Sequence, residues 1–325
     1  MAVRNFISRV GLSAMLSLGA VSPSAAADLK FEHIQNIGSA GDGEGQFNYV
    51  EDLAFSKAGG LLVTDASHAW VQAFEKTGKF IARFGGKGDG DHQLDKPEGI
   101  AVDPEGNIFV ADYNTGFVKK YDASHKWLLT FSEYGSAPGQ NMKSEFMDIH
   151  AGRLYVPDAG NHRVNVFDLS GRPLFQFGEM GSASGQFNNP EAAKFNSEGK
   201  LYVTDLRNDR VQVFDAEGKM LSSFGKSGSG RGELKAPAGL AFDRDNNIYV
   251  TEIGNNRVQV FDKTGKSIAM WGRQGGGDGE FANLHGIIVD SASGRVYVAD
   301  TGNNRIQVFQ QVGAVSTTGS GASKR

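Results

Sequence analysis

Residues 235–272 read KAPAGLAFDRDNNIYVTEIGNNRVQVFDKTGKSIAMWG, a stretch with four short runs rich in Val, Ile, Leu, Phe and Tyr. Asp, Asn and Gly turns such as GNNR separate the runs. Short apolar and β-branched runs between turns of this kind predict β-strands. The stretch therefore predicts a four-stranded antiparallel meander.

The same pattern repeats along the chain. Residues 188–225 (NNPEAAKFNSEGKLYVTDLRNDRVQVFDAEGKMLSSFG) and 282–311 align with this stretch, and weaker copies cover residues 60–85, 106–131 and 152–178. The acidic residues that end the second strand are separated by 47, 46, 47, 47 and 48 positions; they are Asp65, Asp112, Asp158, Asp205, Glu252 and Asp300. Six such units predict a ring of stacked sheets, because one sheet cannot bury both of its faces alone.

The last repeat lacks its fourth strand. It ends after RIQVF at residues 305–309, whereas LKFEHIQNIG at residues 29–38 matches fourth-strand sequences such as GKFIARFG. The N-terminal segment can therefore complete the last sheet, which closes the ring and removes exposed edges. The predicted fold is all-β, a six-bladed β-propeller of four-stranded blades over residues 28–311.

The repeats resemble the NHL repeat. The resemblance rests on the strings FNNPEAAKF, LYVTD, NDRVQVFDAEGK and FGKSGSGRGEL, and it covers residues 29–310. It implies a propeller fold, but it implies less about activity, because similar propellers include extracellular sensor domains, RNA-binding domains and a zinc-dependent amidating lyase.

The two ends of the chain differ from the repeats. Arg4 and Arg9 precede an apolar stretch from Val10 to Val21, and Ala25, Ala26 and Ala27 fit a small-residue cleavage site. We therefore expect residues 1–27 to be a signal peptide and residues 312–325 to be a disordered tail. Such a signal predicts a periplasmic or secreted protein. The alternative is that the N-terminal segment is an amphipathic anchor that is not cleaved. No later stretch is apolar enough to span a membrane.

Composition excludes several function classes. The chain has no cysteine, which rules out disulfides, thiol catalysis and thiolate metal sites. Its formal net charge is −4, and cleavage of the basic N-terminal segment would make it more acidic. An acidic chain lacks the electrostatic footprint for nucleic acid, so we expect none as a partner.

One position of the repeat predicts a site at the mouth of the central channel. Residues at the start of each innermost strand should face the axis, and alignment places Glu51, Glu98, Met147, Glu191, Ala238 and His285 there. A deletion makes the third assignment uncertain. His285, Glu51 and Glu98 should be contiguous because their blades are neighbours. Glu51, Glu98 and His285 are the candidate metal ligands, and a divalent cation such as calcium is the candidate cofactor, because carboxylate oxygens favour hard cations. The alternative is a solvated mouth that binds only water.

A second asymmetry falls on the first two blades. Five positions after the acidic residue, the last four blades have Arg163, Arg210, Arg257 and Arg305, which can return to the carboxylate as structural clasps. Trp70 and Phe117 stand at this position in blades one and two, so Asp65 and Asp112 lose that partner. Together with Glu51 and Glu98, which should lie nearby, these four residues form a candidate patch for a cationic or sugar-like ligand. Burial of both rings between the blades is the competing reading.

The leading functional hypothesis is an exported, non-catalytic scaffold that binds a protein, peptide or glycan on the face with the channel mouth. No nucleophile elbow, P-loop or dinucleotide fingerprint occurs in the sequence. The alternative is a metal-dependent lyase or hydrolase similar to the peptidyl-hydroxyglycine amidating lyase. In that family zinc-ligand histidines occupy this kind of position in a Pro-His context, and only His285, in NLHG, matches.

Overall fold

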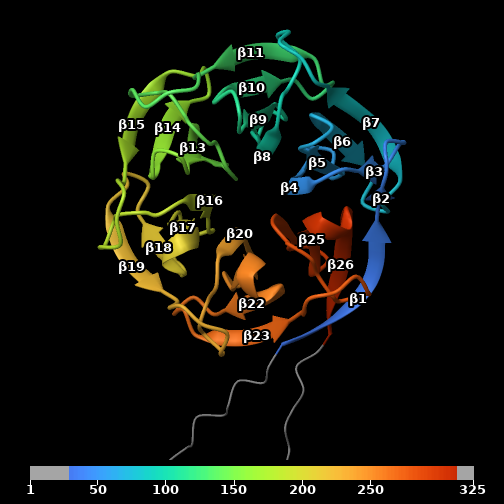
Figure 1. The fold of residues 1–325 in the computed structure, drawn as a ribbon, viewed down its shortest axis with the longest axis vertical. Coiled ribbons are helices and arrows are strands. Elements are labelled where there is room, and N and C mark those ends of the chain that lie inside the picture. The colour runs from blue at the N-terminus through green and yellow to red at the C-terminus, as the bar shows by residue number, and fades with distance from the viewer. Residues whose placement is uncertain (1–28, 313–325) are drawn as a thin grey trace, which may run out of the picture.

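The computed structural model describes residues 29–312, and within them six four-stranded antiparallel sheets surround a central axis like blades (Figure 1). The predicted signal peptide and all but the first residue of the predicted tail lie outside the described residues. The tail prediction is wrong for Val312, which pairs with Lys30 at the end of a strand.

Each blade is a meander from the axis outward. From inner to outer strand, the first three blades are β4(Val50–Phe55), β5(Leu61–Asp65), β6(Trp70–Phe74), β7(Phe80–Gly85); β8(Pro97–Val102), β9(Ile108–Asp112), β10(Val118–Tyr121), β11(Trp127–Phe131); and β12(Asp148–His150), β13(Arg153–Asp158), β14(Arg163–Asp168), β15(Pro173–Phe177). The next two are β16(Pro190–Phe195), β17(Leu201–Asp205), β18(Arg210–Phe214), β19(Met220–Phe224); and β20(Pro237–Phe242), β21(Ile248–Glu252), β22(Arg257–Phe261), β23(Ser267–Trp271).

The sixth blade closes the ring with the N-terminal strand. Its order is β24(Ile287–Asp290), β25(Arg295–Asp300), β26(Arg305–Val312), and then β1(Lys30–Ile37) on the outside. β1 runs antiparallel to β26, and Figure 1 shows it along the outer rim beside the last blade. Phe31 of β1 also stacks on Trp271 of blade five at 4.2 Å between ring centroids. The predicted closure is confirmed.

Few other elements occur in residues 29–312. A short parallel pair, β2(Ser39–Ala40) and β3(Gln46–Phe47), lies in the link between the last blade and the first. Three 3-10 turns follow the second strands of blades four, five and six, at η1(Leu206–Asn208), η2(Ile253–Asn255) and η3(Thr301–Asn303). No helix in this part of the chain is long and apolar enough to cross a membrane.

Burial of the second and third strands explains their sequences. Every residue of β5, β9, β17 and β21 is buried, because neighbouring blades cover both faces of the sheet. The apolar runs are therefore continuous in these strands instead of alternating. Outer strands such as β1 alternate between exposed and part-buried residues, since one of their faces meets solvent. The core consequently lies between blades.

Inner strands of neighbouring blades approach one another closely at the axis. A Cβ added to Gly99 would collide with the carbonyl oxygen of Glu145 in the next blade, and one added to Gly286 with that of Glu51. Thr64 of β5 donates a hydrogen bond to the carbonyl oxygen of Glu98 (2.7 Å), also in the next blade. Thr251 does the same to His285 (2.6 Å). These contacts fix the backbone at the residues that face the channel.

Candidate functional site

One end of the central channel holds a cavity of about 200 Å³ with several ionisable side chains on its wall. The structure brings four sequence-predicted residues together there, namely Glu51, Glu98, Glu191 and His285. The other side chains on the wall include Tyr49, Lys96, Tyr113, Glu145 and Asn189. We call this cavity the glutamate mouth.

The third blade contributes Glu145 rather than Met147. Ser144 bridges to Asp158 as Pro190 does to Asp205, so Glu145 is the structural equivalent of Glu191. Met147 lines a different cavity, at the other end of the channel. The sequence alignment left the third position uncertain because of a deletion, whereas Glu51, Glu98 and Glu145 are evenly spaced by 47 residues. Adding the same interval of 47 residues to Glu98 would have identified Glu145 from the sequence.

His285 and Glu51 lie side by side across the junction of the sixth and first blades. The Nδ1 atom of His285 is 3.7 Å from a carboxylate oxygen of Glu51. It is also 3.1 Å from the carbonyl oxygen of Asn283 and 3.0 Å from the hydroxyl oxygen of Thr301. Burial lowers the pKa of His285 to about 4, so the ring is neutral at physiological pH.

Lys96 is the cation of the glutamate mouth, and sequence reasoning did not single it out. Its ammonium group forms an ion pair with Glu98 and lies 4.0 Å from the centre of the Tyr113 ring. The neighbouring carboxylates outweigh the effect of burial and raise the pKa of Lys96. The residue lies two positions before Glu98, and no catalytic motif marks it.

Burial and mutual repulsion favour the protonated form of Glu51, Glu145 and Glu191. The four carboxyl-bearing residues are at most 6% exposed. Burial, followed by repulsion from other glutamates, raises the pKa of Glu51 and of Glu145 well above the ordinary value. The same two effects raise the pKa of Glu191 to about 8. A cation that entered the mouth would favour the ionised carboxylates, and protons would be released.

The predicted aromatic patch is not part of this cavity. Asp65 is fully buried, accepts a hydrogen bond from the backbone N–H of Asn48 (3.0 Å) and contacts Nδ1 of His68 at 2.8 Å. His68 takes the place of the missing arginine as the side-chain partner of Asp65. Trp70 stacks on His68 at 4.3 Å, and the guanidinium of Arg83 lies 3.9 Å from the centre of its ring.

Asp112 is also buried, and its carboxylate anchors the backbone of the link that precedes blade two. It accepts hydrogen bonds from the N–H groups of Asp95 (2.6 Å) and Lys96 (3.3 Å). Lys119, seven residues later, donates to the link carbonyls of Gly90 and Asp91, and its ammonium lies 5.8 Å from the centre of the Phe117 ring. Asp112 thus lacks the arginine clasp, and Lys119 contacts the link in its place; Asp65, Trp70, Asp112 and Phe117 do not line the mouth.

The arginines at the equivalent position act as clasps, as predicted. Arg163, Arg210, Arg257 and Arg305 each donate through Nε to the acidic residue that ends the second strand, at 2.6–3.1 Å. Their terminal nitrogens donate to carbonyls of the preceding link; for Arg257 these are Ser229, Gly230 and Glu233. The clasps hold the links that carry the mouth residues.

Comparison with known families agrees with the geometry. A family described as a 6-bladed beta-propeller (DUF5128) matches residues 243–314, and the NHL repeat matches residues 94–121. The structure supplies six blades around one axis. The chain is an NHL-repeat six-bladed β-propeller.

Solved structures similar to this NHL propeller include proteins of different kinds. A protein of unknown function from Bacteroides thetaiotaomicron superposes with a TM-score of 0.68 at 16% identity, over 87% of this chain and 76% of the other. A streptogramin B lyase gives 0.61 at 12% identity, over 88% and 98%. Virginiamycin B lyase from Staphylococcus aureus gives 0.61 at 13% identity, over 88% and 100%. At such identities the likeness concerns the fold alone. No curated protein is a significant match to the sequence.

The glutamate mouth does not fit the zinc site that the amidating lyase implies. Among residues 29–312, no group of three or more His, Asp or Glu side chains is arranged so that it could hold a metal ion. His285 uses Nδ1 for Asn283 and Thr301, and Lys96 occupies one face of Glu98. A calcium site stays a prediction.

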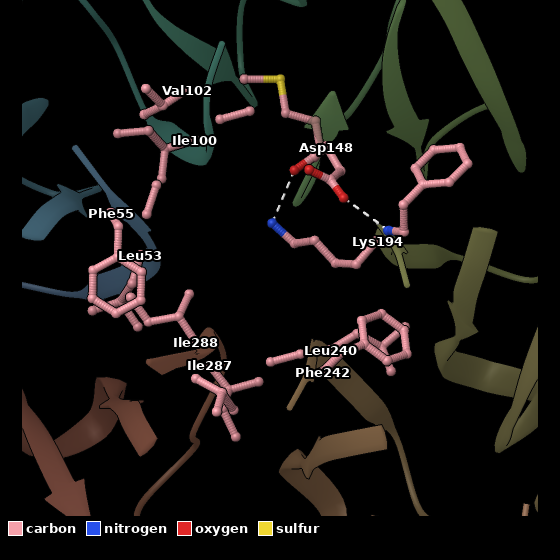
Figure 2. Close-up of a pocket in the computed structure, with 16 residues that line it drawn as sticks. Leu53, Phe55, Ile100, Val102, Asp148, Lys194, Leu240, Phe242, Ile287 and Ile288 are labelled. Atoms are coloured by element: carbon pink, nitrogen blue, oxygen red, sulfur yellow. Dashed lines mark hydrogen bonds between the residues drawn. The ribbon is translucent and has the colours of Figure 1, made fainter. Parts of the chain in front are cut away.

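The other end of the propeller channel is different in character. It holds a cavity of about 290 Å³, and Figure 2 shows apolar side chains such as Leu53, Phe55 and Ile287 around its wall. Lys194 extends from blade four toward the axis and donates to the carbonyl oxygen of Met147 (2.9 Å). Its ammonium is also 3.3 Å from the buried carboxylate of Asp52 in blade one. This ion pair links opposite blades across the channel.

Proposed function

We propose that this NHL propeller is an exported binding scaffold that receives a positively charged group of a protein or peptide in the glutamate mouth. The observation that carries the proposal is the set of four buried glutamates on one cavity wall with one lysine among them. Burial makes these carboxyls costly to ionise, and a bound cation would offset that cost.

An unsatisfied oxygen supports the same function. Glu145 is 3% exposed; its carboxyl group shares a hydrogen bond with the carboxyl group of Glu98, and its Oε2 atom has no other partner within residues 29–312. Buried carboxyl oxygens are normally fully paired, so one on a cavity wall whose partner is another acidic group is typical of a site that is completed by a ligand. A donor on the ligand, such as an ammonium or guanidinium group, supplies the missing hydrogen bond.

A peptide array tests the proposal. Peptides that differ only by lysine, arginine or norleucine at one position are incubated with the protein. Binding is expected for the lysine and arginine peptides, and the double variant Glu51→Gln/Glu191→Gln should lose it. Glu105→Gln, which changes an exposed glutamate in the hairpin between β8 and β9, is the matched control. Equal binding of the norleucine peptides would overturn the proposal, and binding of glycans alone would favour a sugar ligand.

A lyase is the second candidate, because one group in the mouth has a pKa suited to proton transfer. Glu191 has a pKa of about 8, so at neutral pH it can donate a proton, and the neutral ring of His285 lies in the same cavity. Two of the structures similar in fold are a streptogramin B lyase and a virginiamycin B lyase. Loss of a streptogramin B antibiotic on incubation, abolished in Glu191→Gln and in His285→Gln, would support this candidate. Elemental analysis of the protein tests whether any metal takes part.

A further inference from the structure

Lys96 lies where a ligand cation is expected to bind. Its ammonium pairs with Glu98, a side chain that is only 5% exposed, whereas the Lys96 side chain itself is 32% exposed. The ammonium lies between two aromatic rings, 4.0 Å from the centre of Tyr113 and 5.9 Å from that of Tyr49. A carboxylate combined with aromatic faces is the arrangement that recognises ammonium groups in proteins.

The chain offers an internal comparison one blade further on. Lys143 occupies the same place in blade three as Lys96 in blade two, two positions before the mouth glutamate. Its ammonium lies on the same Tyr113 ring, at 5.4 Å from the centre. Lys143 is exposed, does not line the mouth, and has no carboxylate within ion-pair distance in residues 29–312. Of the two lysines, only Lys96 reaches into the site.

Lys96 does not fill the glutamate mouth. The cavity keeps about 200 Å³ of space with Lys96 in place, several times the share of roughly 30 Å³ that one water takes in the liquid. Apart from the hydrogen bond between the Glu145 and Glu98 carboxyl groups, Glu145 Oε2 still has no partner among the described residues. Because a third of the Lys96 side chain is exposed on a flexible four-carbon stem, it can leave the site at the cost of one ion pair.

We infer, on the basis of the function proposed above, that Lys96 is an intramolecular competitor that occupies the site of a primary ammonium ligand, the side chain of a lysine in a partner peptide. The tethered ammonium shows how the ligand's own group is held, against Glu98 and the Tyr113 ring. A ligand binds when it displaces Lys96 or shares the carboxylates with it, and affinity is lowered by the fraction of molecules in which Lys96 is bound.

The test measures the affinity of Nα-acetyl-lysine N-methylamide by calorimetry, with the norleucine analogue as the ligand control. Lys96→Met should bind the lysine analogue roughly tenfold more tightly than the unchanged protein, the result expected when an internal group occupies the site about nine-tenths of the time. Lys143→Met removes the same charge beside the same ring and should change affinity by less than about twofold. Lys96→Arg should stay close to the unchanged protein, because a guanidinium still pairs with Glu98.

The outcomes separate this inference from the proposed function. Should the unchanged protein bind the lysine analogue, and Lys96→Met bind it equally or more weakly, Lys96 is a structural member of the site and not a competitor. Equal gains in Lys96→Met and Lys143→Met would assign the effect to net charge and reject competition. Absence of binding to every form, with thermal unfolding unchanged, would reject both the competition and the proposed function.

Discussion

At the level of single residues, burial decides which groups of the glutamate mouth carry charge. Burial raises the pKa of all four glutamates, while Lys96 keeps its charge because it forms an ion pair with Glu98. Binding of a cation should therefore release protons, and the affinity for an amine should rise with pH as the glutamates ionise.

The raised pKa of Glu191 predicts the direction of a pH effect on stability. Glu191 titrates near 4.5 when unfolded and at about 8 when folded, so the folded state binds the extra proton between these values. Its contribution to stability is lost as pH rises through that window. Glu191→Gln should therefore be more stable than the unchanged protein at pH 9, by about 1–3 kcal/mol, and differ less at pH 5. Urea unfolding at the two pH values measures this, and an equal difference at both would contradict it.

His68 offers a second prediction at this scale. Burial lowers its pKa, but hydrogen bonds and charge from Asp65 and Asp42 outweigh burial and raise the pKa above the ordinary 6.5. The stabilisation by its positive charge is present below pH 6.5 and is lost as pH rises through the folded pKa. NMR titration should find His68 above 6.5, and lower in Asp42→Asn. His125, stacked on Phe84, should titrate below 6.5 because burial lowers its pKa. The reverse order of the two histidines would reject this assignment.

At the level of elements, the link between blades is the unit that places the mouth. Each link is tied to the second and third strands of the blade that follows it by an acidic residue and, in the last four blades, an arginine. Blade one uses His68 and blade two uses Lys119 for related contacts. Trp70 and Phe117 therefore stand where the other blades have the clasping arginine, and His68 and Lys119 make the replacing contacts in blades one and two.

Arg257→Met tests the clasp. Glu252 is fully buried, so loss of Arg257 leaves an uncompensated carboxylate and frees three link carbonyls. We expect a loss of about 3–5 kcal/mol in the free energy of unfolding. Arg172→Met is the matched control, because Arg172 pairs with Asp168 at 3.0 Å but is 74% exposed, and its loss should cost less than about 1 kcal/mol. Similar losses in both variants would show that burial of the clasp does not matter.

At the level of the whole molecule, closure of the ring couples the two ends of the described chain. β1 pairs with β26 from Lys30 to Ile37, so the sixth blade joins residues as far apart in the sequence as Lys30 and Val312. The apolar clusters alternate with the blades, and each includes side chains from neighbouring sheets. Unfolding should therefore be a single cooperative transition for the propeller.

Two substitutions within β1 test the closure. Ile37 is 2% exposed and belongs to the cluster between blades six and one, whereas Ile34 of the same strand is 45% exposed. Ile37→Ala should destabilise the whole propeller by about 2–5 kcal/mol. Ile34→Ala should stay within about 0.5 kcal/mol of the unchanged protein. Thermal unfolding measures both, and a partial transition confined to one blade in Ile37→Ala would contradict cooperative closure.

The sequence by itself determined the fold, because every repeat encodes the same strands and turns and the spacing of Asp65 and its equivalents fixes their number. It also determined closure by residues 29–38 and the facing of Glu51, Glu98, Glu191 and His285 toward one channel end. These features follow from periodicity, which is a local property of the chain.

Only the tertiary structure decided what the mouth contains. Glu145 entered it through a one-residue difference in a turn, and Lys96 through a side chain that reaches across to Tyr113. Asp65 and Asp112 do not face the glutamate mouth, because their carboxylate oxygens accept hydrogen bonds from backbone N–H groups of the links. Alignment of the repeats gives the position of a Cα atom on the ring. The direction of a long side chain and the protonation of a carboxyl group depend on neighbouring residues from other blades. Only the folded molecule brings those residues together.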